Sequence, residues 1–139
     1  MVEDGGEQVM EGRLEEDINS QLGNVLRRLK EAGVTASAVV SRDGIILQSD
    51  MESGEEEKET FAAMAAAVLG AAETATSELK QGVPRRIIIE SGGRMLIEVG
   101  AGPMALLVAS VSPDVSMETA AREIDRAAAE VRALVKPKR

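Results

Sequence analysis

The chain has 139 residues, with 24 acidic against 16 basic side chains and a formal net charge of −8. It contains neither cysteine nor histidine, which excludes disulfides, thiolate nucleophiles, the usual catalytic triads and most zinc sites. The acidic balance argues against binding to nucleic acids, and Phe61 is the only aromatic side chain that could stack on a base. A chain of this length is long enough to form one domain with its own core.

The N-terminal part of the chain is expected to be a tail followed by a helix. Residues 1–10 are acidic and lack periodicity, so we expect them to form a flexible tail. From residue 11 onward the apolar residues recur at helical spacing, and Gly33 is placed to end this helix. Its apolar positions are Leu14, Ile18, Leu22, Val25, Leu26, Leu29 and Ala32.

A β-hairpin is predicted to follow the first helix. Its strands are expected at 34–41 and 44–49, on either side of Arg42-Asp43-Gly44. An Asp-Gly pair between two apolar runs is typical of a tight hairpin, because the turn requires a positive φ that glycine adopts without steric cost.

The second predicted helix has two different apolar surfaces. It begins at Ser53, where Ser53 and Glu56 have the spacing of a capping box, and it ends before Gly82. One surface is a stripe of mostly larger side chains: Phe61, Met64, Val68, Ala71, Ala72, Ala75 and Leu79. The other consists of small residues: Ala62, Ala63, Ala65, Ala66, Ala67 and Gly70. Such a small-residue surface packs either on the protein's own sheet or closely against another helix, and both interpretations stay open.

Three further strands are predicted, at 85–91, 94–99 and 104–111. The last of them is apolar on both faces, which indicates a central strand covered on both sides. In the first, charged residues bracket three consecutive isoleucines, and charges of this kind typically protect an exposed edge strand. The same isoleucines would also be a good template for pairing with another chain.

A third helix is predicted at 117–134, and the basic residues 136–139 form a C-terminal tail. The predicted domain therefore spans 11–135, in the order helix, two strands, helix, three strands, helix. Its mixture of one sheet and three helices belongs to the α/β (α+β) class.

No catalytic, cofactor-binding or metal-binding residue is predicted. The carboxylate clusters at 15–17 and 55–57 lie at or near helix starts, where solvated acidic residues are expected. The glycine pairs in 92–93 and 100–102 each join two strands, whereas a phosphate-binding loop leads from a strand into a helix.

The order of the elements, the Arg42-Asp43-Gly44 hairpin and the segment 100–109 (GAGPMALLVA) together resemble the roadblock family, which includes the dynein light chain roadblock proteins and prokaryotic relatives. The resemblance covers about 18–134. It implies a profilin-like fold, in which a five-stranded antiparallel sheet carries one helix on one face and two on the other.

The resemblance also implies a homodimer. The third strand would pair with its counterpart, and the second helix would pack beside its mate. These are the same two surfaces that the isoleucine run and the small residues single out. The residues expected at the dimer interface are Met64, Ala65, Val68, Ile87, Ile88 and Ile89.

For function, the resemblance implies a non-catalytic module that binds a small Ras-like GTPase, regulates or localises it, and in some cases promotes GTP hydrolysis. The absence of cysteine suits a reducing compartment, so we expect a cytoplasmic location. Neither nucleic acid nor membrane insertion is expected. Arginines at or near loops and strand ends are candidates for an arginine finger, with solvated surface charges as the simpler interpretation: Arg42, Arg85, Arg86 and Arg94. The alternative function is a small-molecule sensor or a structural assembly domain without a GTPase partner.

Overall fold

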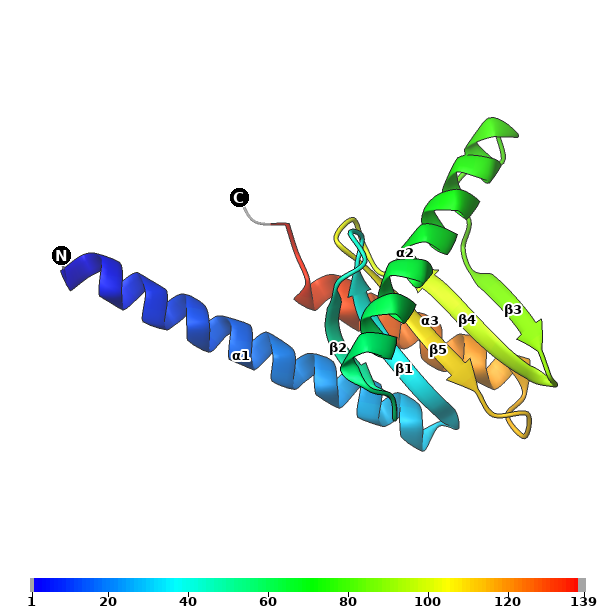
Figure 1. The fold of residues 1–139 in the computed structure, drawn as a ribbon, viewed down its shortest axis with the longest axis horizontal. Helices are drawn as coiled ribbons and strands as arrows, with labels where there is room; N and C mark the ends of the chain where they lie inside the picture. Colours follow the sequence, from blue (N-terminus) through cyan, green and yellow to red (C-terminus); the bar gives the residue numbers. More distant parts are fainter. Residues whose placement is uncertain (1, 138–139) are drawn as a thin grey trace.

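The computed structural model describes the backbone of residues 2–137 and the side chains of residues 14–137. Its elements follow the predicted order (Figure 1). They are α1 (Val2–Glu31), β1 (Val34–Ser41), β2 (Ile46–Asp50), α2 (Glu55–Glu78), β3 (Ile87–Ser91), β4 (Arg94–Gly100), β5 (Ala105–Val111) and α3 (Met117–Leu134).

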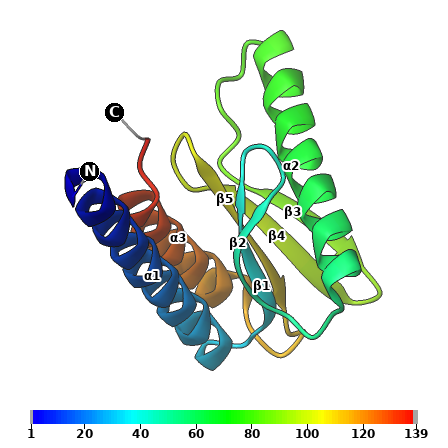
Figure 2. The same cartoon turned by 60° about the vertical axis from the view of Figure 1, so that its left-hand side comes forward.

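The five strands form one antiparallel sheet in the order β2-β1-β5-β4-β3. The predicted positions of two strands are confirmed, because β5 is central and β3 lies at one edge. Helices α1 and α3 cover one face of the sheet, and α2 lies across the other (Figure 2). The predicted arrangement of one helix against two is therefore confirmed.

The face covered by α1 and α3 holds the larger core. Alternate residues of β5, including Leu107 and Val111, point toward this face, as Val39 of β1 and Ile97 of β4 do. The two helices supply mainly long aliphatic side chains at helical spacing: Leu22, Val25, Leu26 and Leu29 from α1, and Ile124 and Val131 from α3. All of these side chains are buried.

The face covered by α2 holds a smaller core built from small residues. Ala62, Ala65 and Leu69 of α2 pack there on Ala38 and Val40 of β1 and on Leu106 and Val108 of β5. The C-terminal half of α2 projects beyond the end of the sheet (Figure 1). This half therefore has little of the sheet beneath it.

The first helix begins at Val2, whereas the sequence predicts a tail at 1–10 and a helix that starts at residue 11. The backbone of 2–10 is helical, because each residue added to an existing helix gains one hydrogen bond without a new nucleation cost. Residues 138 and 139 of the predicted basic tail lie outside the described residues.

The start of α2 also differs from the prediction. The N-cap is Gly54, which has no side chain to accept a hydrogen bond, so Ser53 and Glu56 do not form a capping box. The hairpin at Arg42-Asp43-Gly44 is confirmed. Gly44 has a φ of +88°, and a Cβ there would lie 3.0 Å from the Cα of Ala63 on α2.

Candidate interaction surface

Two elements expose apolar side chains on the α2 face and its edge. Met64 and Val68 of α2 are 58% and 36% exposed, and Ile88 and Ile89 of β3 are 42% and 38% exposed. No other described strand pairs with the outer edge of β3. We call these four side chains the exposed apolar surface.

The direction in which Met64 and Val68 point follows from the neighbours of α2. Phe61 lines a cavity together with Leu96 of β4, whereas Ala63 contacts the β1–β2 turn at Gly44. Met64 and Val68 follow Phe61 by three and seven residues, so they share its side of the helix. Met64 and Val68 therefore lie on the side of α2 that is nearer to β4 and β3 than to β2.

In the structure, the small-residue surface of α2 contributes more to the core than the predicted stripe of larger side chains does. The small residues Ala62 and Ala65 are buried against the sheet together with Leu69, and the larger Met64 and Leu79 are exposed. Packing of the small-residue surface on the protein's own sheet is thus the correct interpretation for Ala62 and Ala65. At Gly70, which lies in the same predicted surface, a Cβ would meet nothing within 4 Å.

The three isoleucines of β3 divide between the two faces of the sheet. Ile88 lies opposite Ile97, which belongs to the core under α1 and α3. Ile87 and Ile89 lie opposite Glu98 and Leu96 and point toward the α2 face. Both faces of this edge strand are therefore partly apolar.

The six predicted interface residues do not all lie on the exposed apolar surface. Four of them make it up: Met64, Val68, Ile88 and Ile89. Ala65 is buried inside the α2-face core, and Ile87 is half-buried against the same core. Ala65 supports this surface from below, by bringing α2 close to the sheet.

The candidate arginines mostly hold the fold together. Arg42 forms an ion pair with Glu73 of α2 at 3.0 Å and donates to the Gly102 carbonyl at 2.9 Å, which links three segments. Arg86 forms an ion pair with Asp125 of α3 at 2.7 Å. Arg85 is 3.7 Å from the same carboxylate, and Arg94 lies exposed at the start of β4.

Glu98 is a buried carboxylate that was not among the predicted functional residues. It lies on β4 facing α2, between Val108 and Ile87 on the neighbouring strands, and its side chain is 1% exposed. Its Oε1 accepts no hydrogen bond. Because burial disfavours the charged form, the pKa of this carboxyl is raised from 4.5 to about 7. In the sequence, the alternation of Leu96, Glu98 and Gly100 resembles an ordinary half-solvated strand.

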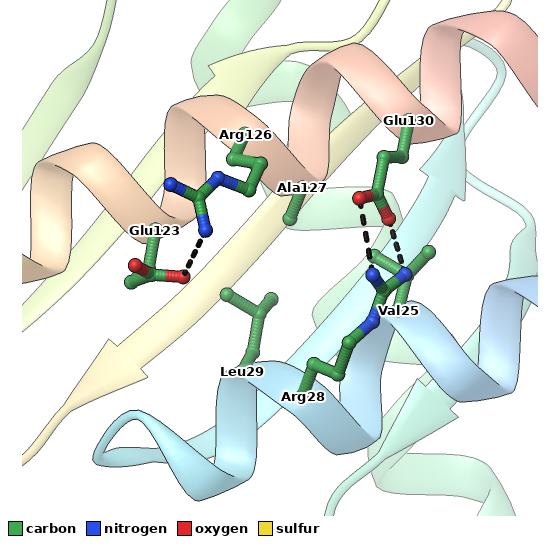
Figure 3. A pocket seen from close by; sticks show the side chains of 7 residues that line it. All are labelled: Val25, Arg28, Leu29, Glu123, Arg126, Ala127 and Glu130. Atoms are coloured by element: carbon green, nitrogen blue, oxygen red, sulfur yellow. Dashed lines mark hydrogen bonds and ion pairs between the residues drawn. The ribbon is translucent and has the colours of Figure 1, made fainter.

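A shallow groove between α1 and α3 is largely charged (Figure 3). Arg28 of α1 forms two hydrogen bonds with the carboxylate of Glu130 on α3, and Arg126 lies 3.7 Å from Glu123. These charges are paired with one another across and along the groove. The pairing connects the two helices and leaves little unmatched charge for a ligand.

Among the residues that the structure describes, no group of three or more acidic side chains is arranged to hold a metal ion. In the same part of the chain, none of the helices combines the length and the apolar character needed to cross a bilayer.

The sequence model of the Roadblock/LC7 domain matches residues 22–110. The match begins in α1 and ends in β5, so it covers α2 and all of the sheet except the last residue of β5. The chain therefore belongs to the Roadblock/LC7 domain family, as the resemblance predicted.

The relatives agree with this assignment. The uncharacterized protein MJ0714 of Methanocaldococcus jannaschii is 32% identical over 93 residues, which cover 65% of this chain and 78% of that protein. The gliding protein MglB of Thermus thermophilus superimposes with a TM-score of 0.75 at 16% identity, over 84% of this chain and 90% of that chain.

The predicted likeness to profilin is also confirmed. Profilin II of Acanthamoeba castellanii superimposes with a TM-score of 0.55 at 17% identity, over 75% of this chain and 89% of that chain. At this level of identity, the likeness to profilin and to MglB shows a shared fold and nothing about function.

Proposed function

We propose that this protein is a non-catalytic, cytoplasmic homodimer that binds a small Ras-like GTPase and regulates or localises it. The observation that carries the proposal is the exposed apolar surface, in which the flank of α2 and the unpaired edge of β3 lie on the same half of the molecule. Membership of the Roadblock/LC7 family supports the same function.

Dimerisation would pair the free edge of β3 and bury the exposed apolar side chains of α2 in the same interface. Pairing of β3 with β3 of a second copy gives hydrogen-bond partners to the unpaired edge and removes an aggregation hazard. Burial of Met64 and Val68 against the second copy removes apolar side chains from water. A two-fold axis beside β3 would bring the same patch of both copies together, as in most homodimers.

The dimer is tested by placing one charge on the edge strand. Ile88→Asp puts an unpaired carboxylate into the proposed interface, so we expect light scattering to report the monomer mass. Ile45→Asp is the matched control, because Ile45 is 64% exposed and lies at the β1–β2 turn, away from β3. Circular dichroism checks that both variants fold. A folded Ile88→Asp dimer with unchanged mass and affinity would show that the interface lies elsewhere.

A GTPase would be regulated through differential affinity for its two nucleotide states. A rigid dimer that binds one conformation of the switch loops more tightly shifts the GTPase toward that conformation, without supplying any catalytic group. This requires neither a cofactor nor a nucleotide bound to the Roadblock/LC7 domain itself.

The proposed binding of a GTPase is tested by affinity capture from a lysate of the source cells. The capture is run once with excess GDP and once with a non-hydrolysable GTP analogue, and the retained proteins are identified by mass spectrometry. We expect a small GTPase to be retained in one nucleotide state. Retention of no GTPase in either state would favour the alternative, a structural assembly or sensory domain.

A further inference from the structure

The α2 face contains a partly open cavity of about 240 Å³. Its lining is mostly apolar, with Leu96 and Val108 from the sheet, Met51 from the loop before α2, and Phe61 from α2 itself. Ser110, Ala36 and Ser37 complete the wall. The only aromatic side chain of the chain thus lies at this cavity.

Glu98 lies next to this cavity. Leu96 precedes it by two residues on the same face of β4, and Val108 lies directly opposite it on β5. Side chains that stand opposite each other in a sheet have Cβ atoms about 5 Å apart, which is within the reach of a glutamate. Glu98 is not itself one of the lining residues, but two of its neighbours on the sheet are, and its Oε1 has no hydrogen-bond partner.

Among the side chains that the structure describes, no basic group forms an ion pair with Glu98. Its neighbours on the same sheet face are apolar: Ile87, Ile89, Leu96, Leu106 and Val108. The half-buried charged residues of α2 are Lys58 and Glu73, which lie 3.9 Å from Glu55 and 3.0 Å from Arg42 respectively. Within the described residues, each of these charges already has a partner of opposite sign.

We infer that this cavity is a binding site for a small apolar amine, whose hydrocarbon body fills the space beside Phe61 and whose ammonium group pairs with Glu98. An apolar cavity of about 150 Å³ holds benzene, so a volume of about 240 Å³ suits one ring with a short substituent. An ammonium supplies the donor that Oε1 lacks and the positive charge that a buried carboxylate requires. The inference does not depend on the proposed GTPase or on the dimer.

Three probes of the same shape separate the contributions of apolar filling, hydrogen bonding and charge. They are toluene, benzyl alcohol and benzylamine, and their affinities are measured on the full-length protein by NMR shifts of the methyl groups of Leu96 and Val108. At pH 8 we expect benzylamine to bind about tenfold or more tightly than toluene, because a hydrogen bond to a charged group is among the stronger ones. Benzyl alcohol should lie between them.

The pH dependence identifies Glu98 as the partner. Its carboxyl must release its proton to pair with an ammonium, and its pKa is about 7. The ionised fraction falls about tenfold from pH 8 to pH 6, so the affinity for benzylamine should fall about tenfold, while that for toluene stays constant.

Two variants complete the test. Glu98→Gln keeps the size of the side chain and removes its charge, so it should abolish both the preference for benzylamine and the pH dependence. Glu90→Gln is the matched control, because Glu90 is an exposed carboxylate on β3, and it should change neither. The inference is overturned if no probe binds, if the three probes bind equally, or if Glu98→Gln retains the preference for the amine.

Discussion

The two faces of the sheet differ in how completely they are covered. Under α1 and α3, long aliphatic side chains from both helices and from β1, β4 and β5 fill a closed core. Under α2, the helix contributes alanines where α1 contributes leucines. This face also contains a cavity and a buried glutamate whose Oε1 has no hydrogen-bond partner. The flank of α2 and the nearby β3 edge also leave apolar side chains exposed.

This difference supports a division between the two faces, one of which stabilises the fold while the other serves the proposed association. Tight packing on one face contributes most of the hydrophobic stabilisation, since that contribution scales with the apolar area removed from water. The other face holds α2 by a thin layer of small side chains and by the Arg42–Glu73 ion pair. It therefore retains space and apolar surface through which the proposed ligand or second copy would gain binding energy.

The largest expected effect compares two neighbours on β4. Ile97 is fully buried under α1 and α3, so Ile97→Ala should lower the free energy of unfolding by about 4 kcal/mol. Leu96 is half-buried and already borders the cavity, so Leu96→Ala should cost about 1–2 kcal/mol. Urea denaturation of both variants measures the difference. Equal losses would mean that the two faces are equally well packed.

The second prediction concerns Glu98 and pH. Its pKa is about 7 in the folded state against 4.5 for the ordinary carboxyl, so the folded protein holds this proton more tightly than the unfolded chain. The contribution of this proton to the free energy of unfolding is fully present below pH 4.5 and is lost as the pH rises through 7. A shift of this size corresponds to about 3 kcal/mol.

Glu98→Gln isolates this contribution, because glutamine has no proton to lose. At pH 8 the variant should be more stable than the wild type by up to about 3 kcal/mol, and at pH 4.5 the two should differ little. Urea denaturation across this pH range measures the difference, with Glu90→Gln as the exposed control. A constant difference between variant and wild type at all pH values would mean that Glu98 does not titrate with the raised pKa.

The face of the sheet that α1 and α3 cover was predictable from the sequence. Strand β5 is apolar on both faces, and α3 runs over Met117–Leu134 as expected, because its apolar residues recur at one helical spacing. The hairpin at Gly44 was equally clear, since it depends on local turn chemistry.

The face under α2 was harder to predict, for a physical reason. A helix that is apolar nearly all round has no single periodic stripe, so spacing alone could not tell that Ala62 and Ala65, and not Met64, contact the sheet. Glu98 was missed because a charged residue on a strand ordinarily faces water. Its burial depends on how α2 crosses the sheet, which is a tertiary feature.

The smallest expected effects compare the N-termini of α3 and α2. Ser116 caps α3, and its Oγ accepts a hydrogen bond from the Thr119 N–H at 3.1 Å. Ser116→Ala should therefore lower the free energy of unfolding by about 1 kcal/mol. Thermal and urea denaturation measure this loss, and an unchanged stability would mean that water replaces the cap without cost.

At the N-terminus of α2, a substitution should raise the free energy of unfolding instead of lowering it. Gly54 occupies the N-cap with φ −68° and ψ 163°, an extended conformation that any residue adopts, so Gly54→Ser introduces no backbone strain. The new Cβ would approach the carboxylate of Glu57, whose exposed side chain can turn away into water. The serine Oγ could then accept one of the unpaired N–H groups of the first turn, for a gain of a few tenths of a kcal/mol. A loss of stability would instead mean that Glu57 is held in place, and that the α2 face is more tightly organised at this end than its small residues indicate.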